Sequence, residues 1–262
     1  MKLLKLNPTS NGIRHKLKIQ KNLLCKNNRI FKNLLIGTKN WAGRNSTTGR
    51  ITIRHRGKGC KNLFRIITFN NIAFFAIVLG IAYDPNRNIF ISLNYNFLTK
   101  KIFNTSAICN VAPGSLILCK ETTIEFRLGY RLKLKSIPVG TLINTISLNY
   151  NSHAKYIRAA GTYGQLIQKN NFLCKIKLPS GLFINILPFS YATIGILTNL
   201  HHNQIIIGKA GTNRLNGFRP AVRGIAMNPV DHPHGGRSNG GCHPVTPWGK
   251  PTRGKPTVKK KK

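Results

Sequence analysis

Short apolar runs separated by turn-forming residues make up the centre of the chain. The runs are rich in Ile, Val, Leu and Phe, side chains that fit a pleated sheet. Turn signals such as Asp84–Arg87, Pro113–Gly114 and Pro179–Gly181 separate them. This pattern predicts strands at Leu63–Phe69, Ile72–Ile81, Ile89–Leu93, Asn94–Leu98, Ser115–Cys119, Thr141–Leu148, Leu173–Leu178 and Leu182–Leu187, the last two forming a hairpin.

Strands this short and this closely spaced are typical of small antiparallel barrels, so the sequence predicts a mainly β protein with two small domains. The run Ile72–Ala82 is apolar at nearly every position, and periodicity alone does not separate a buried helix from a buried strand there. Its β-branched and aromatic content favours a strand. From Gly208 onward Gly and Pro are dense and strand signals vanish, which predicts an irregular extension ending in the basic run Lys259–Lys262.

Charge narrows the choice of partner. The 262 residues contain 42 Lys and Arg but only 4 Asp and Glu, for a formal charge of +38. Few basic side chains can find a carboxylate within the chain, and nucleic acid is the densest source of external negative charge. An anionic membrane surface is the rival partner, but it calls for a basic amphipathic helix, and the sequence has no long stripe of that period. The longest apolar run, Ile72–Ala82, is also too short to span a bilayer.

The cysteines and the amino-acid bias bear on the cellular compartment. Six cysteines are scattered with no CxxC pair, which argues against a zinc ribbon or a disulfide scaffold and predicts reduced, buried thiols. Asn, Ile, Lys, Leu and Phe are abundant, whereas Ala, Asp and Glu are scarce. This bias indicates an A/T-rich genome, either that of an organelle or that of an A/T-rich bacterium.

Three clusters of basic residues are candidates for a binding site. In the first, Gly43–Gly59, the basic residues Arg50, Arg54, Arg56 and Lys58 are spaced by two or four positions, so a strand would place them on one face. Arginine matches phosphate oxygens, and the glycines allow the backbone to come close to a ligand. A solvated, charged loop is the alternative interpretation.

The second cluster, Lys155–Gly164, mixes basic and aromatic residues around small ones. Such a mixture suits RNA, since aromatic and guanidinium planes stack on unpaired bases, although Tyr156 and Tyr163 could equally belong to a core. The third cluster, Gly208–Arg223, runs into the segment Arg219–Gly236, in which three prolines and three glycines disfavour regular helix or strand. We expect an irregular ribbon whose shape is set by a polyanion.

Asp231, His232 and His234 in this segment invite two sharper interpretations. A carboxylate beside an imidazole could perform acid–base chemistry, as in a nuclease or acyl transferase acting on RNA, but no nucleophile motif and no second carboxylate lie near in sequence. His232, His234, Cys242 and His243 could bind zinc, but their spacing matches no common structural zinc motif. The favoured interpretation is that hydrogen bonds shape the loop, which then touches phosphate or ribose.

The motifs in and around these clusters occur in a fixed order. They are Gly43–Gly59, Asp84–Arg87, Ile137–Gly140, Ala160–Tyr163, Leu215–Gly236 and His243–Gly249, spanning about residues 40–255. Together they resemble the large-subunit ribosomal protein L2 family. The most specific part is Asn228–Gly236, with the sequence Asn-Pro-Val-Asp-His-Pro-His-Gly-Gly. The match is weak over 88–110 and 165–205.

This resemblance implies an OB-fold barrel followed by an SH3-like barrel. The predicted parts are a basic N-terminal arm at 1–36, an OB-fold RNA-binding domain at 37–118, an SH3-like barrel at 119–207 and a basic Gly/Pro-rich extension at 208–262. The resemblance also implies a structural protein, not an enzyme, that binds large-subunit rRNA near the peptidyl-transferase region and supports subunit association. His232 matches a histidine once proposed to take part in peptide-bond formation, whereas the family picture assigns that chemistry to RNA.

The clusters and the resemblance together define a predicted rRNA-binding set: Arg44, Arg50, Arg54, His55, Arg56, Lys58, Lys155, Arg158, Lys209, Arg214, Arg219, Arg223, Asn228, Asp231, His232, His234 and Arg237. The implied partners are large-subunit rRNA, other large-subunit proteins and the small subunit at the inter-subunit bridge region. No membrane, no small-molecule substrate and no cofactor beyond rRNA-bound Mg²⁺ is implied.

The segment His243–Gly249, followed by Lys-Pro-Thr, resembles bacterial and mitochondrial members more than plastid ones. Combined with the A/T bias, this resemblance predicts a mitochondrial ribosome. A plastid and a bacterial cytoplasm are the alternatives.

Overall fold

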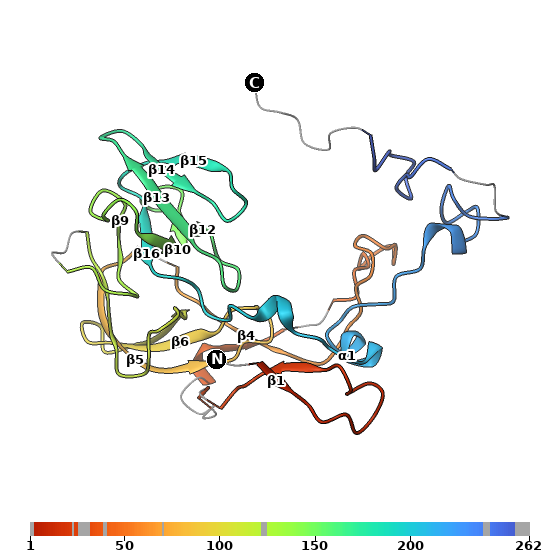
Figure 1. Cartoon of the computed structure of the whole chain (residues 1–262), viewed down its shortest axis with the longest axis horizontal. Coiled ribbons are helices and arrows are strands. Elements are labelled where there is room, and N and C mark those ends of the chain that lie inside the picture. The colour runs from red at the N-terminus through yellow and green to blue at the C-terminus, as the bar shows by residue number, and fades with distance from the viewer. Residues whose placement is uncertain are drawn as a thin grey trace. The chain divides into compact units, whose positions relative to one another are not determined.

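The structure is a computed structural model of the whole chain (Figure 1). It describes residues 3–22, 24–25, 32–38, 41–69, 71–121, 125–237 and 242–254. The chain divides into two compact units. Unit 1 consists of Met1–Asn40 and Cys60–Thr212, and unit 2 of Trp41–Gly59 and Asn213–Lys262.

Unit 1 is built around a ten-stranded sheet with the order β15-β14-β13-β10-β16-β9-β8-β5-β6-β7. The first part of this sheet contains β5 (Phe74–Ala82), β6 (Ile91–Asn96), β7 (Ile102–Ser106) and β8 (Leu116–Cys119), all paired antiparallel. The second part contains β9 (Arg131–Lys133), β10 (Leu142–Asn144), β13 (Gly164–Lys169), β14 (Cys174–Lys177), β15 (Phe183–Ile186) and β16 (Tyr191–Ile194), also antiparallel. The two parts join where β8 and β9 run parallel, through the pair Cys119 and Arg131.

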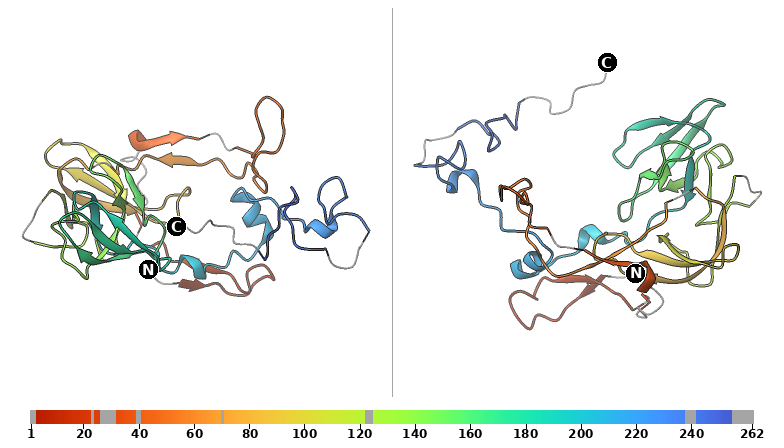
Figure 2. Two further views of the ribbon diagram at one scale, coloured as in Figure 1. Left: turned by 90° about the horizontal axis from the view of Figure 1, so that it is seen from above. Right: turned by 180° about the vertical axis from the view of Figure 1, so that it is seen from behind.

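Smaller elements accompany this sheet among the described residues. The two-stranded pairs are β1 (Leu3–Lys5) with β2 (Leu17–Ile19), β3 (Leu35–Gly37) with β4 (Leu63–Arg65), and β11 (Ile146–Ser147) with β12 (Ala154–Tyr156). The first pair is the red hairpin of Figures 1 and 2. The helical elements are α1 (Ala210–Leu215) and the 3₁₀ turns η1 (Lys32–Leu34), η2 (His202–Gln204) and η3 (Gly224–Ala226).

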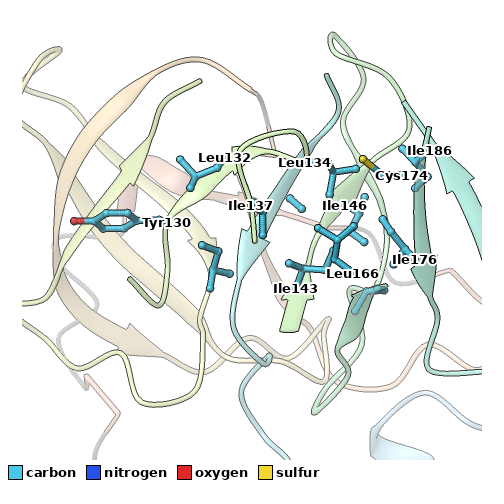
Figure 3. Close-up of a cluster of buried hydrophobic side chains, with 13 residues drawn as sticks. Tyr130, Leu132, Leu134, Ile137, Ile143, Ile146, Leu166, Cys174, Ile176 and Ile186 are labelled. Atoms are coloured by element: carbon cyan, nitrogen blue, oxygen red, sulfur yellow. The ribbon is translucent and has the colours of Figure 1, made fainter. Parts of the chain in front are cut away.

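Each part of the large sheet has a hydrophobic core of its own. In the second part, Ile143, Leu166 and Ile176 are fully buried and lie in the cluster of Figure 3. The first part encloses a smaller cluster that includes Val78 and Ile117. Burying one such aliphatic side chain stabilises a fold by about 1.5–3 kcal/mol, so these two clusters hold the sheet together.

The predicted strand at Ile72–Ile81 is confirmed as β5, which begins two residues later and ends one residue later, at Phe74–Ala82. In β5 the residues Ala76, Val78 and Ala82 are buried, whereas Phe75 and Leu79 on the alternate positions are 39% and 44% exposed. The alternation of burial is that of a strand with one face against a core. Because the exposed face is also apolar, the sequence pattern did not reveal this alternation.

The structure divides two stretches of predicted strand differently, and the predicted strand Leu63–Phe69 ends at Arg65. Ile89–Leu93 and Asn94–Leu98 contribute to one strand, β6, because the buried Asn94 continues the strand and donates a side-chain hydrogen bond to Thr105 Oγ1 at 2.8 Å. Conversely, Thr141–Leu148 is split into β10 and β11. Thr145, between them, has φ of 43°, a left-handed conformation that an extended strand does not contain.

Several strands were missed, among them β7, β9, β12, β13 and β16. They carry Asn, Gln, Thr, Lys or Arg, so their local composition resembles that of loops. Pairing with neighbours makes them strands nonetheless. The mainly β fold class is confirmed. The extension from residue 208 is not wholly irregular, because it contains α1.

The prediction of buried thiols is only partly correct. Cys119 and Cys174 are buried in the sheet, but Cys60 and Cys242 are exposed. The exposed pair lies in segments outside the strands and beyond the hydrophobic clusters. A cysteine in such a segment has no apolar surroundings in which to be buried.

Candidate nucleic-acid interface

The first basic cluster, residues 43–59, folds into an irregular loop of unit 2. Arg44 and Ile51 form an isolated β-bridge, and the Ile53 amide donates to the Gly43 carbonyl at 3.1 Å. Gly43 has φ of 71°, and a Cβ there would collide with the Ile53 carbonyl oxygen. Backbone hydrogen bonds therefore close this loop from within.

Arg50, Arg54, Arg56 and Lys58 do not lie on one face of a strand, so that prediction is wrong. His55, in the middle of the group, has φ of 59°, which interrupts any extended run. All four basic side chains are nevertheless exposed. The loop presents them to solvent without the regular alternation that their spacing suggested.

The first basic cluster lies beside the part of the third cluster that belongs to unit 2. The Gly57 amide donates to the Gly217 carbonyl at 2.7 Å, and the Arg219 amide donates to the His55 carbonyl at 3.0 Å. These two bonds connect segments that are far apart in sequence. Two clusters that were recognised separately therefore form one basic surface.

Two arginines of this surface lie over aromatic rings. The Arg54 guanidinium carbon is 5.3 Å from the centroid of the Trp248 ring, and that of Arg56 is 5.9 Å from Phe218. Trp248 is 74% exposed. Both aromatic residues are missing from the predicted set. The sequence feature that could have identified them is a large aromatic side chain in a Gly/Pro-dense segment, where no hydrophobic core is expected.

The segment 223–236 is an irregular ribbon, as predicted, and Asn228 organises it. The amides of Asp231 and His232 both donate to the Asn228 carbonyl, at 3.0 and 3.3 Å. The Gly235 amide then donates to the His232 carbonyl at 2.8 Å. The ribbon is thus a succession of tight turns held by its own backbone.

His232 is the buried member of the predicted set, with 8% of its surface exposed. Its ring packs on Gly224, where an added Cβ would lie 2.6 Å from the ring Cε1. Its Nδ1 accepts the backbone N–H of His234 at 3.0 Å. A neutral imidazole that accepts at Nδ1 carries its proton on Nε2, so the ring is available as a donor and not as a base at Nε2.

Asp231 does not orient this imidazole. Its carboxylate is exposed and makes no hydrogen bond or ion pair with any residue that the structure describes. His234 uses its Nε2 for the His243 carbonyl oxygen at 2.8 Å. The carboxylate–imidazole dyad required for acid–base catalysis is therefore not assembled.

Two other kinds of site are absent within the described ranges. No group of three or more His, Cys, Asp or Glu side chains there is close enough to hold a metal ion, including the proposed His232, His234, Cys242 and His243. None of the helices in the same ranges has the length and apolar character needed to cross a membrane.

The second basic cluster belongs to unit 1. Lys155, on β12, and Arg158 are exposed, and the Arg158 guanidinium carbon lies 5.7 Å from the Phe69 ring centroid. Tyr156 packs against the larger core, whereas Tyr163 is 47% exposed. The two tyrosines thus divide between the two interpretations: the first is a core residue, and the second is open to a ligand.

Apart from His232 and the half-buried His234, every member of the predicted set is exposed: Arg44, Arg50, Arg54, His55, Arg56, Lys58, Lys155, Arg158, Lys209, Arg214, Arg219, Arg223, Asn228, Asp231 and Arg237. Most of the set lies in unit 2; Lys155, Arg158 and Lys209 lie in unit 1.

The acids of the chain do not neutralise these cations. Asp84, Glu121 and Glu125 form ion pairs in unit 1 with basic residues outside the predicted set, namely Arg65, Arg87, Lys133 and Arg127. Within the described part of the chain, no ion pair joins a basic residue of the set to a carboxylate. The exposed arginines therefore present uncompensated charge, which an external polyanion can neutralise.

Comparison with known proteins gives one consistent result. Residues 31–119 match the family model described as Ribosomal Proteins L2, RNA binding N-terminal domain, and residues 127–249 match Ribosomal Proteins L2, C-terminal domain. The Large ribosomal subunit protein uL2m of Reclinomonas americana is 43% identical over 274 residues, which cover 100% of this chain and 95% of that protein. Large ribosomal subunit protein uL2 of Orientia tsutsugamushi is 43% identical over 260 residues (97% and 94% covered), and that of Ehrlichia canis 41% over 263 residues (98% and 94%).

Proposed function

The chain belongs to the ribosomal protein L2 family, and from this premise we propose that it is a structural, rRNA-binding constituent of the large ribosomal subunit. The two regions that match the family models correspond to its OB-fold and SH3-like domains. One observation carries the proposal: the exposed arginines of unit 2 have no carboxylate partner in the described residues and lie on loops closed by their own backbone. The phosphates of folded RNA supply the missing negative charge.

On this proposal, the residues of the predicted rRNA-binding set and the neighbouring Trp248 have different roles. The exposed arginines and lysines bind phosphate oxygens, for which guanidinium groups are well shaped. Arg54 and Trp248 stack on a base, since every base offers a flat face to such a pair. His232 keeps the ribbon in shape from inside and offers its Nε2–H to the RNA. The proposed parts remain the arm at 1–36, the OB-fold domain at 37–118, the SH3-like barrel at 119–207 and the extension at 208–262.

We further propose that the bound rRNA lies near the peptidyl-transferase region, with rRNA-bound Mg²⁺ close by. Other large-subunit proteins would be neighbours, and the small subunit would approach at the inter-subunit bridge region. A histidine-dependent enzyme has no support, because Asp231 does not contact His232 and the His232 Nδ1 is occupied by the His234 amide. The family is one of structural proteins.

We propose that the ribosome in question is mitochondrial. The abundance of Asn, Ile, Lys and Phe indicates an A/T-rich genome, and one of the similar proteins is the uL2m of Reclinomonas americana. Mass spectrometry of purified mitochondrial ribosomes is the test. Recovery of the peptides from plastid or cytoplasmic ribosomes, and not from mitochondrial ones, would contradict this assignment.

The RNA-binding surface can be tested with the full-length protein and large-subunit rRNA. Each phosphate contact contributes about 0.7–0.9 to the slope of log affinity against log salt. Arg50→Ala combined with Arg219→Ala should therefore weaken binding and lower this slope by about 1.4–1.8. Circular dichroism spectra recorded in parallel would show that the double variant remains folded.

Lys175→Ala combined with Lys177→Ala is the matched control. Both lysines are exposed on β14, outside the predicted set, and the change in charge is the same. Equal losses for the two double variants would mean that binding follows net charge alone. The proposed surface would then be rejected.

A further inference from the structure

Arg131 is a buried cation where the two parts of the large sheet of unit 1 join. It lies on β9, opposite Cys119 of β8, and is 6% exposed. Burial lowers the pKa of its guanidinium to about 10, so it is still protonated at neutral pH. Among the described residues, no carboxylate forms an ion pair with it. A buried charge without a counter-charge is costly, so its surroundings call for an explanation.

Neutral oxygens satisfy most of the guanidinium. Nη2 and Nε donate to Asn71 Oδ1 at 2.8 and 3.3 Å. Nη1 donates to the Thr145 carbonyl at 2.9 Å and to Thr193 Oγ1 at 3.2 Å. A guanidinium has five N–H donors, so one N–H on Nη2 has no acceptor in the described part of the chain.

A cavity of about 30 Å³ adjoins this group, lined on its apolar side by Phe74 and Ile117 and on its polar side by Arg131, Ser106 and Thr193. Ser106 is 7% exposed, and its Oγ has no hydrogen-bond partner among the described residues. Among the described residues, no carboxylate lines the cavity. This space is large enough to admit a water molecule or one monatomic ion.

The hydrogen-bonding groups that line the cavity and have no partner determine which ligand can occupy it. The Nη2–H of Arg131 can only donate, and the Ser106 hydroxyl can donate as well. An occupant must therefore accept hydrogen bonds from both. A water molecule accepts but leaves the charge uncompensated, whereas an anion also attracts the guanidinium, and that attraction is much stronger in a protein interior than in water.

We propose that this cavity is a halide-binding site, occupied by a single chloride ion held by Arg131 Nη2 and Ser106 Oγ. The ion would neutralise the buried guanidinium at the junction of β8 and β9. It would thereby stabilise the contact between the two parts of the sheet. This site is separate from the proposed rRNA-binding set and does not depend on it.

Crystals of the full-length protein grown in sodium bromide provide the direct test, because bromide replaces chloride and scatters anomalously. We expect an anomalous peak in the cavity within hydrogen-bond distance of Arg131 Nη2 and Ser106 Oγ. A cavity that holds only water, or nothing, overturns the proposal.

Thermal unfolding of the same protein provides a test in solution, at constant ionic strength in sodium chloride or sodium methanesulfonate. An ion that binds only the folded state raises the melting temperature, and we expect chloride to raise it by about 2–4 °C. Ser106→Ala should lose most of this difference while still folding. Ser180→Ala, in an exposed turn, should keep it. The same chloride effect in all three proteins would show that the ions act at the surface, and the halide site would be rejected.

Discussion

His232 accepts the backbone N–H of His234 through its Nδ1, at 3.0 Å, and its ring is buried against Gly224. The acceptor nitrogen of the imidazole is thus engaged with the loop in which it lies. Asp231 stands beside it in sequence but makes no contact that would orient the ring. The histidine that invites a catalytic interpretation instead supports the shape of the ribbon at 223–236.

His232→Ala should therefore act on structure and binding, not on chemistry. Removing a buried acceptor leaves the His234 amide unsatisfied and costs about 1–3 kcal/mol. We expect rRNA affinity and incorporation into large subunits to fall together. Peptide-bond formation per assembled ribosome, measured in a single-turnover assay, should stay close to that of the wild type. A large loss of that rate in fully assembled ribosomes carrying the variant would contradict this interpretation.

Gly224→Ala tests the packing of the same ring. The added Cβ would lie 2.6–2.9 Å from Cε1, Nδ1 and Cγ of His232, so the ring must move, and overpacking of this kind costs about 1–3 kcal/mol. Gly211→Ala in α1 is the matched control, because its Cβ meets nothing within 4 Å. The control should be neutral or slightly stabilising, since alanine favours helix. Hydrogen exchange of the amides at 228–236 would detect the difference; equal protection in both variants would count against the packing.

Asp84→Asn should destabilise unit 1 strongly. Asp84 has no exposed surface, accepts the Asn86 amide at 2.9 Å, bonds to Arg87 and lies 3.9 Å from Arg65. Removing its charge leaves two poorly solvated guanidinium groups without a partner, at a cost of about 3 kcal/mol. Denaturant unfolding measures the free energy of unfolding of each variant. Glu125→Gln, at the exposed ion pair with Arg127, is the control and should change the free energy of unfolding little. An equal loss of stability in both variants would contradict the special role of the buried Asp84.

Cys119 should be unreactive at neutral pH. Burial raises the pKa of its thiol to about 11, so the reactive thiolate forms in the folded state only near that pH. The folded thiol keeps its proton above pH 9, where the unfolded thiol ionises, so its contribution to stability falls as pH rises from 9 toward 11. Iodoacetamide labelling followed by mass spectrometry should modify the exposed Cys60 and Cys242 first. Labelling of Cys119 at the same rate in the native protein would disprove the burial.

The sequence predicted best those features that depend on residue type and on short spacing along the chain. The apolar runs gave most of the central strands, because β-branched side chains and turn residues act locally. The basic side chains of the clusters are exposed and have no carboxylate partner in the part of the chain that the structure describes. The sequence did not predict a role for Trp248 or the burial of Arg131. The Trp248 ring lies beside Arg54 of a distant segment, and Arg131 is buried by strands that are remote in sequence.

By itself, then, the sequence determined the mainly β class, the shortage of internal counter-charge and the motifs that identify the family. These properties depend on residue type and short spacing alone. Only the tertiary structure decided that residues 55–57 pair with 217–219, that His232 turns inward, and that Arg131 is buried with no acid paired to it among the described residues. The first and the third follow from contacts between segments distant in sequence, whose register is set by the packing of the whole unit and by no local preference. His232 is held within its own loop, against Gly224 and the His234 amide, by a succession of turns that residue types alone do not specify.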